Sequence, residues 1–518
     1  MRKLSFLPIL ILVIASCGDE SPEKKETKNW FDAQTDYSFQ SKAVNLISNE
    51  ENIMTYGSFK MNQILKKGLF DSEMAKSSVV KLGKKELNKI NESVNMNAPM
   101  YYALQMGDTP EEPNVLLFGK VKDQNKMIDM IEEQNPYANR EEADNYSIFY
   151  NEGMIAGIGK EQFIIKINSS GQLDMVTPRE DMDRLMGSLD SETSNPSVES
   201  IFSESKDMTM AFDYKALMTM IKAQTNYYSN MNDKFLDLYD QVAINLSFEE
   251  GAIKMLYHWT YKKGMEEFDF FKSDAKDIVA QLGTGNPVMA FAANIDVENI
   301  EKFRKKYYPE SISSQLQSME IEGLEQMIPD ELPVIEALIM KEGIKSFIDG
   351  RFGGALFMND GEELGIPDYN FMAGIGPNMA DLIKEGIDEI PEMSMFVNMM
   401  NQFTLNNEIL LGYSSEKFAP NGSSILKTEK FKNFGNKPIS LFVDFSKIPK
   451  DGLLKGIDRS LVDYEELLDI VEAITMEFDM TEGNITIHTK DANKNALTYI
   501  MDRLSDMISN TSLLLNAI

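Results

Sequence analysis

The sequence predicts an α+β protein of two related lobes, each an antiparallel sheet with helices packed on one face. Three observations support this prediction: segments that alternate apolar and polar residues, amphipathic segments between them, and an ordered internal repeat. With 518 residues the chain is too long for one hydrophobic core. Its content of 43% hydrophobic and 26% charged residues is typical of a globular protein.

Two strand–turn–strand units carry the clearest strand pattern. In residues 244–248 and 474–478, apolar side chains alternate with polar ones. This period of two predicts strands with one buried face, formed by the apolar residues. Acidic residues and a glycine, Gly251 or Gly483, then predict a turn from which an apolar strand returns.

Amphipathic segments between the strands predict helices. Residues 125–134 place methionine and isoleucine side chains on one side, and residues 379–387 behave in the same way. The final segment, residues 495–515, predicts a closing amphipathic helix.

Four pieces of the first half recur in the same order in the second half, which predicts an internal duplication. The matched pairs are 53–59 with 288–294, 103–108 with 355–360, 210–214 with 441–445, and 244–248 with 474–478. Each match alone is weak, and generic strand composition is the alternative explanation. On this basis we expect an N-terminal lobe over residues 30–280 and a C-terminal lobe over residues 281–518.

The first sixteen residues have the order of a bacterial secretion signal. A basic pair, Arg2 and Lys3, precedes a largely apolar run over residues 4–14. This run is far shorter than the ~20 residues that a membrane-spanning helix needs. Residues 14–17, Ile-Ala-Ser-Cys, close the segment and resemble the bacterial lipobox, in which an aliphatic residue and two small residues precede a lipidated cysteine.

The lipobox resemblance implies cleavage before Cys17, diacylglycerol on its sulfur and a third acyl chain, such as palmitate, on the freed amine. Two or more acyl chains anchor a protein stably. An ordinary signal peptide with an incidental cysteine is the alternative, but Cys17 is the only cysteine in the chain. Residues 17–29 predict a flexible acidic tether. Its acidic start is similar to surface-export signals of Bacteroidota lipoproteins. We therefore expect a lipid anchor in the bacterial outer membrane, with the chain at the cell surface or on the periplasmic face.

The lipobox joins two further patterns, the strand-then-helix unit at residues 287–303 and the terminal unit at residues 474–504. Together they resemble a Bacteroidota lipoprotein family that is known only as domain of unknown function 4836. The resemblance covers most of residues 30–518 and depends on patterns rather than on invariant chemistry. It brings no established activity and no catalytic residues.

The sequence predicts no catalytic residue, no cofactor and no metal site. Only two histidines exist, His258 and His488, and they lie at different distances from their turn glycines, so they do not predict a shared site. No Gly-x-Ser-x-Gly turn and no complete phosphate-binding glycine motif occurs. Cysteine catalysis is excluded if Cys17 is lipidated.

Two acidic segments could hold a cation. Residues 491–495 place oxygens at loop positions 1, 3 and 5, but Ala496 stands where an EF-hand needs glycine. We interpret this segment as a strand exit followed by a helix cap. Residues 359–363 form an acidic loop for which a solvated turn is the simpler interpretation.

The charge of the chain limits its partners. Cleavage before Cys17 removes Arg2 and Lys3, so the net charge goes from −31 to −33. Such a surface repels nucleic acid and anionic headgroups. We expect a non-enzymatic protein that binds the bilayer through its acylated N-terminus and another envelope protein or a glycan through its folded part. The alternatives are a carboxylate-based glycan hydrolase and a cation-binding surface protein.

Overall fold

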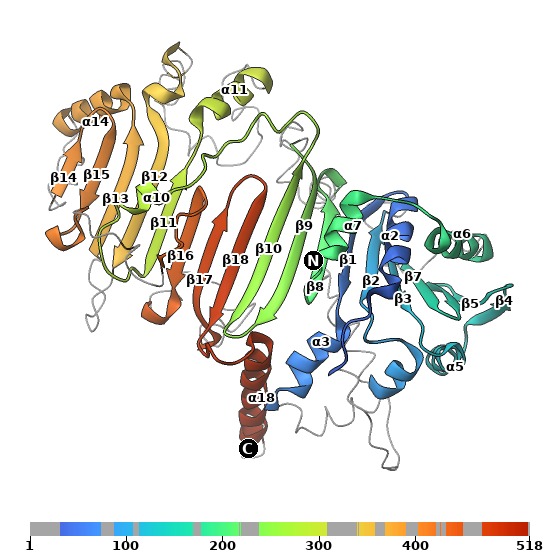
Figure 1. The fold of residues 1–518 in the computed structure, drawn as a ribbon. Helices are drawn as coiled ribbons and strands as arrows, with labels where there is room; N and C mark the ends of the chain where they lie inside the picture. The colour runs from blue at the N-terminus through green and yellow to red at the C-terminus, as the bar shows by residue number, and fades with distance from the viewer. Residues whose placement is uncertain are drawn as a thin grey trace. The chain divides into compact units, whose positions relative to one another are not determined.

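The computed structural model describes most of the chain after residue 31 (Figure 1). The described residues are 32–73, 87–106, 113–168, 178–216, 218, 238–307, 339, 341–357, 368–389, 402–420, 425, 431–448 and 469–515. Within them the chain forms 18 strands with helices between them, and the strand pairings given below are antiparallel. The protein is therefore α+β, as the sequence predicts.

The chain divides into two compact units that are discontinuous in sequence. Unit 1 contains residues 1–220, 243–250 and 493–518, and unit 2 contains residues 221–242 and 251–492. These units differ from a single division at residue 280, because the chain leaves unit 1 and returns to it for its last helix.

Unit 1 contains a sheet of eight consecutively paired strands. From one edge inward the order is β4 (Asn139–Glu142), β5 (Tyr146–Asn151), β6 (Met154–Gly159), β7 (Gln162–Asn168), β3 (Asn114–Lys120), β2 (Met100–Gln105), β1 (Ile53–Phe59) and β8 (Met208–Asp213).

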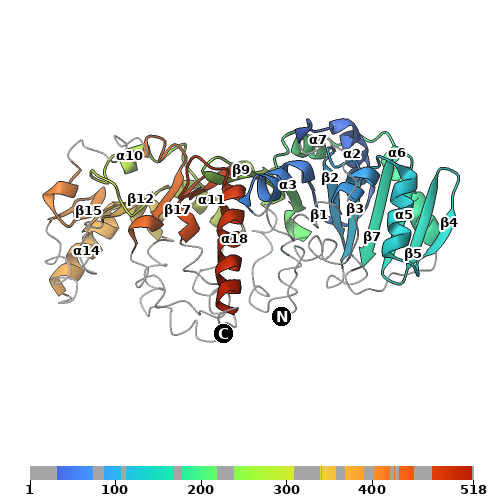
Figure 2. The ribbon, with the colours of Figure 1, turned by 90° about the horizontal axis from the view of Figure 1, so that it is seen from below.

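Helices cover both faces of the unit 1 sheet, so the expectation of one covered face is wrong for this unit. One core is formed with α2 (Gln40–Asn49), α6 (Pro178–Asp190) and α7 (Pro196–Ser203), and it takes Ile148 and Ile164 from the sheet. A second core is formed with α5 (Gln124–Gln134) and takes Phe149 and Phe163. Neighbouring strand residues point to opposite faces, so both positions of each pair must be apolar. In Figure 2, α5 is drawn alongside β7 and β5 of this sheet.

Unit 2 contains a sheet of nine consecutively paired strands. The order is β14 (Gln402–Leu405), β15 (Ile409–Tyr413), β13 (Asp368–Ile375), β12 (Ile348–Phe357), β11 (Met289–Asn294), β16 (Ile439–Asp444), β17 (Val471–Phe478), β18 (Glu482–Thr489) and β10 (Ala252–Tyr261).

Two cores lie within unit 2. The first packs α10 (Lys276–Val279) against sheet residues such as Ala290 and Phe442. The second is aromatic, and α11 (Val297–Tyr307) contributes Phe303, whose ring meets that of Phe268 edge-on at 5.2 Å between centroids. The predicted helix near residues 379–387 is confirmed as α14 (Pro377–Glu389).

The pairing pattern at the centre of each sheet recurs. In unit 1, Tyr56 of β1 lies opposite Ala103 and Ala211. In unit 2, Ala290 of β11 lies opposite Ala355 and Phe442. The other matched segments fall on β2 with β12, β8 with β16, and β9 (Tyr239–Glu249) with β17. Several of the matched ends, among them residues 107, 108 and 358–360, lie outside the described residues.

The strand pairings suggest an alignment of β1 with β11 that is shifted by one residue from the alignment suggested by the sequence. They make Tyr56 correspond to Ala290, whereas the sequence match pairs Tyr56 with Phe291. A shift by one residue reverses the face on which every side chain lies. Tyr56 is 5% exposed and Phe291 is 41% exposed, so the sequence match places them on opposite faces and the pairings correct it.

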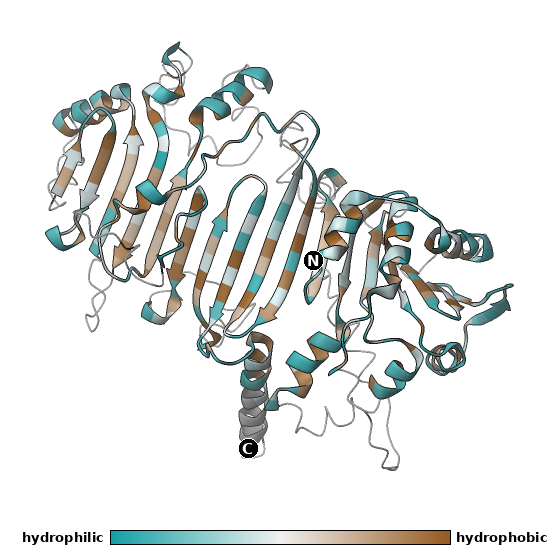
Figure 3. Ribbon diagram, in the orientation of Figure 1, coloured by the Kyte–Doolittle hydropathy of each residue, from teal (hydrophilic) through white to brown (hydrophobic). Residues whose placement is uncertain are grey.

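The strands around residues 244–248 and 474–478 are confirmed, but the predicted buried face is wrong for residues 244–248. In residues 474–478 every side chain is half-buried. Asn245 is buried and accepts a 2.6 Å hydrogen bond from the Thr209 hydroxyl, while Ile244 and Leu246 stay half-buried. On β8 the buried residues are Thr209 and Ala211, and Met210 between them is 38% exposed. Figure 3 shows this alternation of hydrophobic and hydrophilic residues along β9, β10, β17 and β18. Period two is visible in the sequence, but it does not say which set of side chains a helix will cover.

The last helix is also confirmed, as α18 (Ala496–Leu515). Its cap is Asn495, whose side-chain oxygen accepts hydrogen bonds from the backbone N–H groups of Leu497 at 3.1 Å and Thr498 at 3.5 Å. The interpretation of residues 491–495 as a strand exit and helix cap is therefore correct. Among the described helices, none has both the length and the apolar composition needed to cross a membrane.

Candidate functional site

Buried carboxylates were the first candidates, because paired acids would support glycan hydrolysis. In unit 1, the Glu50 side chain is 1% exposed and forms an ion pair with Arg184. Arg184 also contacts Asp181 at 2.5 Å, and Lys166 contacts Asp181 at 2.6 Å. Two acids thus face two bases, and the network is neutral.

The pKa values in this network argue for a structural role. Burial alone would raise the pKa of Asp181, but Lys166 and Arg184 outweigh burial and lower it. A general acid needs the opposite, a raised pKa that keeps its proton near neutral pH. The network therefore stabilises the packing of α6 on α2 and β7.

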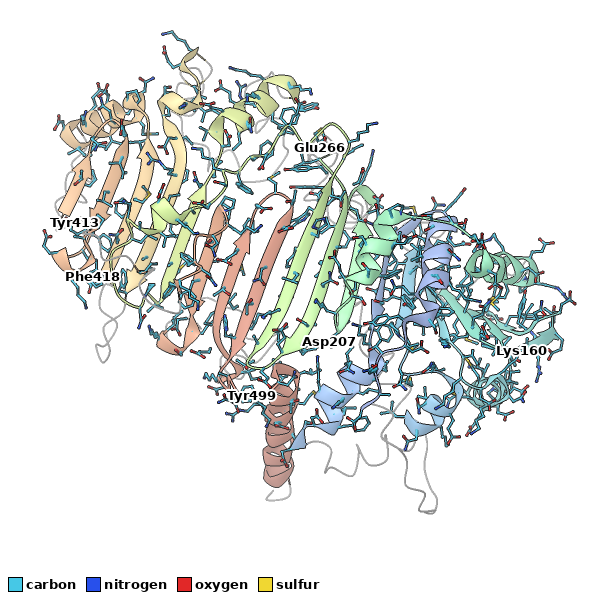
Figure 4. All side chains as sticks on the ribbon, in the orientation of Figure 1. Lys160, Asp207, Glu266, Tyr413, Phe418 and Tyr499 are labelled. Carbon is cyan, nitrogen blue, oxygen red and sulfur yellow. The ribbon has the colours of Figure 1, made fainter. Side chains whose placement is uncertain are left out.

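Two other shielded acids are engaged in the same way. Asp207, labelled in Figure 4, accepts hydrogen bonds from Lys67 at 2.6 Å and from the Phe248 backbone N–H at 2.7 Å. In unit 2, Asp444 caps its own turn through the Ser446 hydroxyl at 2.5 Å, with the Lys447 ammonium 3.7 Å away. Both acids fix local backbone geometry.

The two histidines lie in return strands, as predicted, and the structure does not bring them together. His488 on β18 lies opposite Ala252 of β10, and its Nε2 is 3.5 Å from the Thr475 hydroxyl. His258 lies opposite Glu482, six residues farther along β10. At ~3.3 Å per residue the two positions are about 20 Å apart. No described group of three or more histidine, cysteine or acidic residues could hold a metal ion.

The other predicted positions lie outside the described residues. These are the secretion signal, Cys17, the tether and the acidic loop at residues 359–363. The structure therefore neither supports nor contradicts lipidation of Cys17.

The described surface has an open hollow where α5 meets the β4–β5 hairpin, and no motif in the sequence predicts it. The hollow encloses about 300 Å³. The residues that line it are Glu132, Asn135, Pro136, Ala138, Arg140 and Phe149. All of these residues come from one segment of the chain, residues 132–149.

A tight turn after α5 forms one wall of the hollow. Asn135 caps α5 through its N–H to the Ile131 carbonyl, and its own carbonyl accepts a 3.0 Å hydrogen bond from the Ala138 N–H. Asparagine followed by proline is typical of the first two positions of a β-turn. Tyr137 therefore lies at the apex of the turn, where it is 94% exposed.

Arg140 forms the opposite wall and is held rigidly. It lies opposite Phe149 across the β4–β5 pair, with its guanidinium carbon 5.5 Å from the ring centroid. Its Nη1 donates to Glu132 at 2.7 Å, and its Nε donates to Glu142 at 2.7 Å. The two carboxylates, Glu132 first, raise the pKa of the Arg140 guanidinium. Stacking on Phe149 and two ion pairs fix its position on both sides.

Glu142 is fixed in turn. The Ser147 hydroxyl donates to its carboxylate at 2.8 Å. This bond, and then Arg140, lower the pKa of Glu142, so it stays ionised at neutral pH. The hollow thus has a preformed polar wall of the Arg140 guanidinium and the Glu132 carboxylate, with Glu142 holding Arg140 from behind, and an apolar side formed by the turn. We take this α5–β4 hollow as the candidate site.

Comparisons with known proteins leave the identity of the chain open. No protein-family model matches it, and no curated protein matches it. Among solved structures, crystal forms III, I and IV of TP0453 show similarity over 43%, 44% and 45% of this chain and over 80%, 79% and 83% of TP0453. The identity is 10% in each case, and the TM-scores are 0.27, 0.26 and 0.26. Similarity at this level carries no argument about this chain.

Proposed function

We propose that the chain is a bacterial envelope lipoprotein, anchored in the outer membrane by acyl chains on Cys17, that acts by binding rather than by catalysis. The lipobox supports the anchor, since the only cysteine of 518 residues stands at the position that the motif requires. The α5–β4 hollow supports the binding role, because it combines open space with prepositioned donors and acceptors.

The ion pairs of the least exposed acids are the observation that favours binding over hydrolysis. Glu50, Asp207 and Asp444 have side chains that are 1%, 7% and 2% exposed, and each faces a cation. A glycosidase instead keeps one carboxylic acid protonated beside a second carboxylate in a cleft. The described acids of low exposure thus favour the non-enzymatic alternative.

The anchor is tested by metabolic labelling with an alkyne analogue of palmitate. We expect the wild-type chain to take up label and the Cys17→Ala variant to take up none, because the thiol is the first site of acylation. A Ser16→Ala variant is the matched control, since it keeps a small residue before the cysteine and should label normally. Equal labelling of wild type and Cys17→Ala would disprove the anchor.

The choice between binding and hydrolysis is tested by incubating the chain with oligosaccharides and separating the products by chromatography. We expect intact oligosaccharides after prolonged incubation. Chain cleavage that disappears in an acid-to-amide variant would establish the hydrolase instead. For the cation-binding alternative, a thermal shift with Ca²⁺ that EDTA reverses would be required.

We also propose that the two units descend from one duplicated ancestor and that the chain belongs with the lipoproteins of domain of unknown function 4836. The recurring pairings of Tyr56 and Ala290 support the duplication, since both of their neighbours match in register. The family assignment depends on the lipobox and the strand-and-helix patterns alone. An alignment of homologues would test the duplication and the family assignment, and both predict that Tyr56 aligns with Ala290 in related chains.

A further inference from the structure

The charges of Arg140 and Glu132, which line the α5–β4 hollow, and of Glu142, which contacts Arg140, already compensate one another. Arg140 faces Glu132 and Glu142 at distances of 2.6 to 2.7 Å, which leaves a local balance of one negative charge. An anionic ligand would have to displace these carboxylates from the guanidinium. A cation would have to draw both of them away from Arg140. A ligand without net charge meets neither cost.

Hydrogen-bonding groups nevertheless remain in the hollow. A guanidinium has five N–H groups, and three of those of Arg140 point to the two carboxylates. Within the described residues two N–H groups remain, beside the side-chain amide of Asn135 and the second oxygen of Glu132. Donors and acceptors therefore alternate over a small area, which suits a ligand whose hydroxyl groups both donate and accept.

The turn supplies the apolar part of the site. Pro136 lines the hollow, and Tyr137 follows it with 94% of its surface exposed. An aromatic ring in water offers a flat apolar face and a polar hydroxyl at its edge. Sugar rings have the complementary form, with an apolar C–H face and hydroxyl groups around the edge.

We propose that the α5–β4 hollow binds a neutral saccharide, with the sugar ring on Tyr137 and its hydroxyl groups on Arg140, Glu132 and Asn135. The inference rests on the proposed binding function and names the class of its ligand. The volume of about 300 Å³ is at the lower end of ligand pockets. It suits a small sugar or the end of a longer chain.

Binding is tested by saturation-transfer NMR and titration calorimetry with cellohexaose, maltohexaose, xylohexaose and mannohexaose, and with polygalacturonate as the acidic probe. We expect one or more of the neutral probes to bind, and Tyr137→Ala to weaken that binding about tenfold through loss of ring contact. Tyr137→Phe should keep it. Tyr37→Ala is the matched control, because Tyr37 is also exposed, at 45%, but its ring lies against the Lys60 ammonium, 5.3 Å from the ring centroid, and not at the turn beside the hollow. If no neutral probe binds, or if Tyr137→Ala binds as tightly as wild type, the inference is overturned.

A second variant tests the preference for neutral ligands. Replacing Glu132 and Glu142 by glutamine leaves Arg140 uncompensated, and we expect a gain of polygalacturonate binding of tenfold or more. Polygalacturonate binding by the wild type at the strength of a neutral probe would overturn the preference. These outcomes are separate from the proposed function. A lipidated chain that binds no saccharide refutes only the ligand, whereas a chain that binds and cleaves one refutes only the non-enzymatic role.

Discussion

The two units share the centre of their sheets and differ at one edge. In order of pairing, unit 1 contains β8, β1, β2, β3, β7 and β6. Unit 2 contains β16, β11, β12, β13, β15 and β14 in the corresponding order. Unit 1 then adds the β4–β5 hairpin, and the described part of unit 2 has no strand beyond β14.

The candidate site lies on the added part. Arg140, Glu142 and Phe149 belong to the hairpin, and Glu132 belongs to the helix beside it. The shared strands carry the buried residues of the cores, where each substitution affects packing. The other strand of the hairpin, β5, also contributes Ile148 and Phe149 to the cores, but the edge strand β4 contributes no core residue. An edge strand of this kind can vary with little effect on packing, so it is a suitable place for a binding surface.

The largest difference that we predict between the units comes from the ion-pair network of unit 1. Arg184→Met should lower the free energy of unfolding by about 3 kcal/mol, because it leaves the Glu50 carboxylate, 1% exposed, without its cation. Urea unfolding with hydrogen–deuterium exchange would measure the loss and locate it in unit 1 peptides. The control is Lys384→Met in unit 2, whose partner Asp381 is 70% exposed, and it should change the value by less than ~0.5 kcal/mol. A similar loss in both variants would contradict the prediction.

The next largest difference that we predict concerns a glycine of β1, in the strand group β8–β1–β2 of unit 1, which resembles β16–β11–β12 of unit 2. The pairings make Gly57 of β1 correspond to Phe291 of β11. A Cβ atom at Gly57 would lie 2.1 Å from the Thr209 carbonyl oxygen, so Gly57→Ala should cost about 2–3 kcal/mol of unfolding free energy. Phe291 is 41% exposed, and Phe291→Ala should cost less than half as much. Thermal unfolding of both variants checks the order, and the reverse order would show that the correspondence is wrong.

The strands and helices compared above also show which features the sequence could predict. Alternation along the strands and the helical pattern of residues 125–134 located the elements correctly, because local periodicity depends on the residues themselves. The sequence match of β1 with β11 differs by one residue from the match that their strand pairings favour, since the pairings depend on the neighbouring strands. The buried face at Asn245 was missed because its partner, Thr209, is 36 residues away in the sequence.

The candidate site was missed for a similar reason. Asn135 and Pro136 signal a turn, and a reader of the sequence could have found that turn. Nothing local brings Glu132 to Arg140, because their 2.7 Å contact needs the hairpin to fold back along α5. Among the acids, Glu50, Asp207 and Asp444 form ion pairs or hydrogen bonds whose partners are distant in the sequence or fixed by a turn.

The cap of α18 gives a smaller expected effect, within unit 1. Asn495→Ala should cost about 1 kcal/mol of unfolding free energy, because its side chain caps α18 and also donates a 2.7 Å hydrogen bond to the Phe248 carbonyl. Asn495→Asp should keep the cap and lose only the second bond. Denaturant unfolding of the two variants separates these contributions. Equal losses would mean that the cap contributes nothing.

The smallest effect is a pH dependence that should be local to each unit. In unit 1, burial would raise the pKa of Asp36, but the Lys120 ammonium and the Ser38 hydroxyl lower it from 3.8 to about 2. A folded pKa below the unfolded value stabilises the fold above pH 3.8, and this contribution is lost as the pH falls towards 2. In unit 2, burial likewise opposes ionisation of Asp479, and Lys437 lowers its pKa.

The lysine of each pair provides the test. The side chains of Lys120 and Asp36 are 30% and 32% exposed, so solvent screening should limit the effect to less than ~1 kcal/mol. Lys120→Met should reduce the loss of protection between pH 4 and pH 2 in unit 1 peptides, and Lys437→Met should do so in unit 2 peptides. Hydrogen–deuterium exchange, corrected for the intrinsic rate at each pH, measures both. If either variant changes both units equally, the two sheets respond to acid as one cooperative structure, and the comparison between separate units fails at this level.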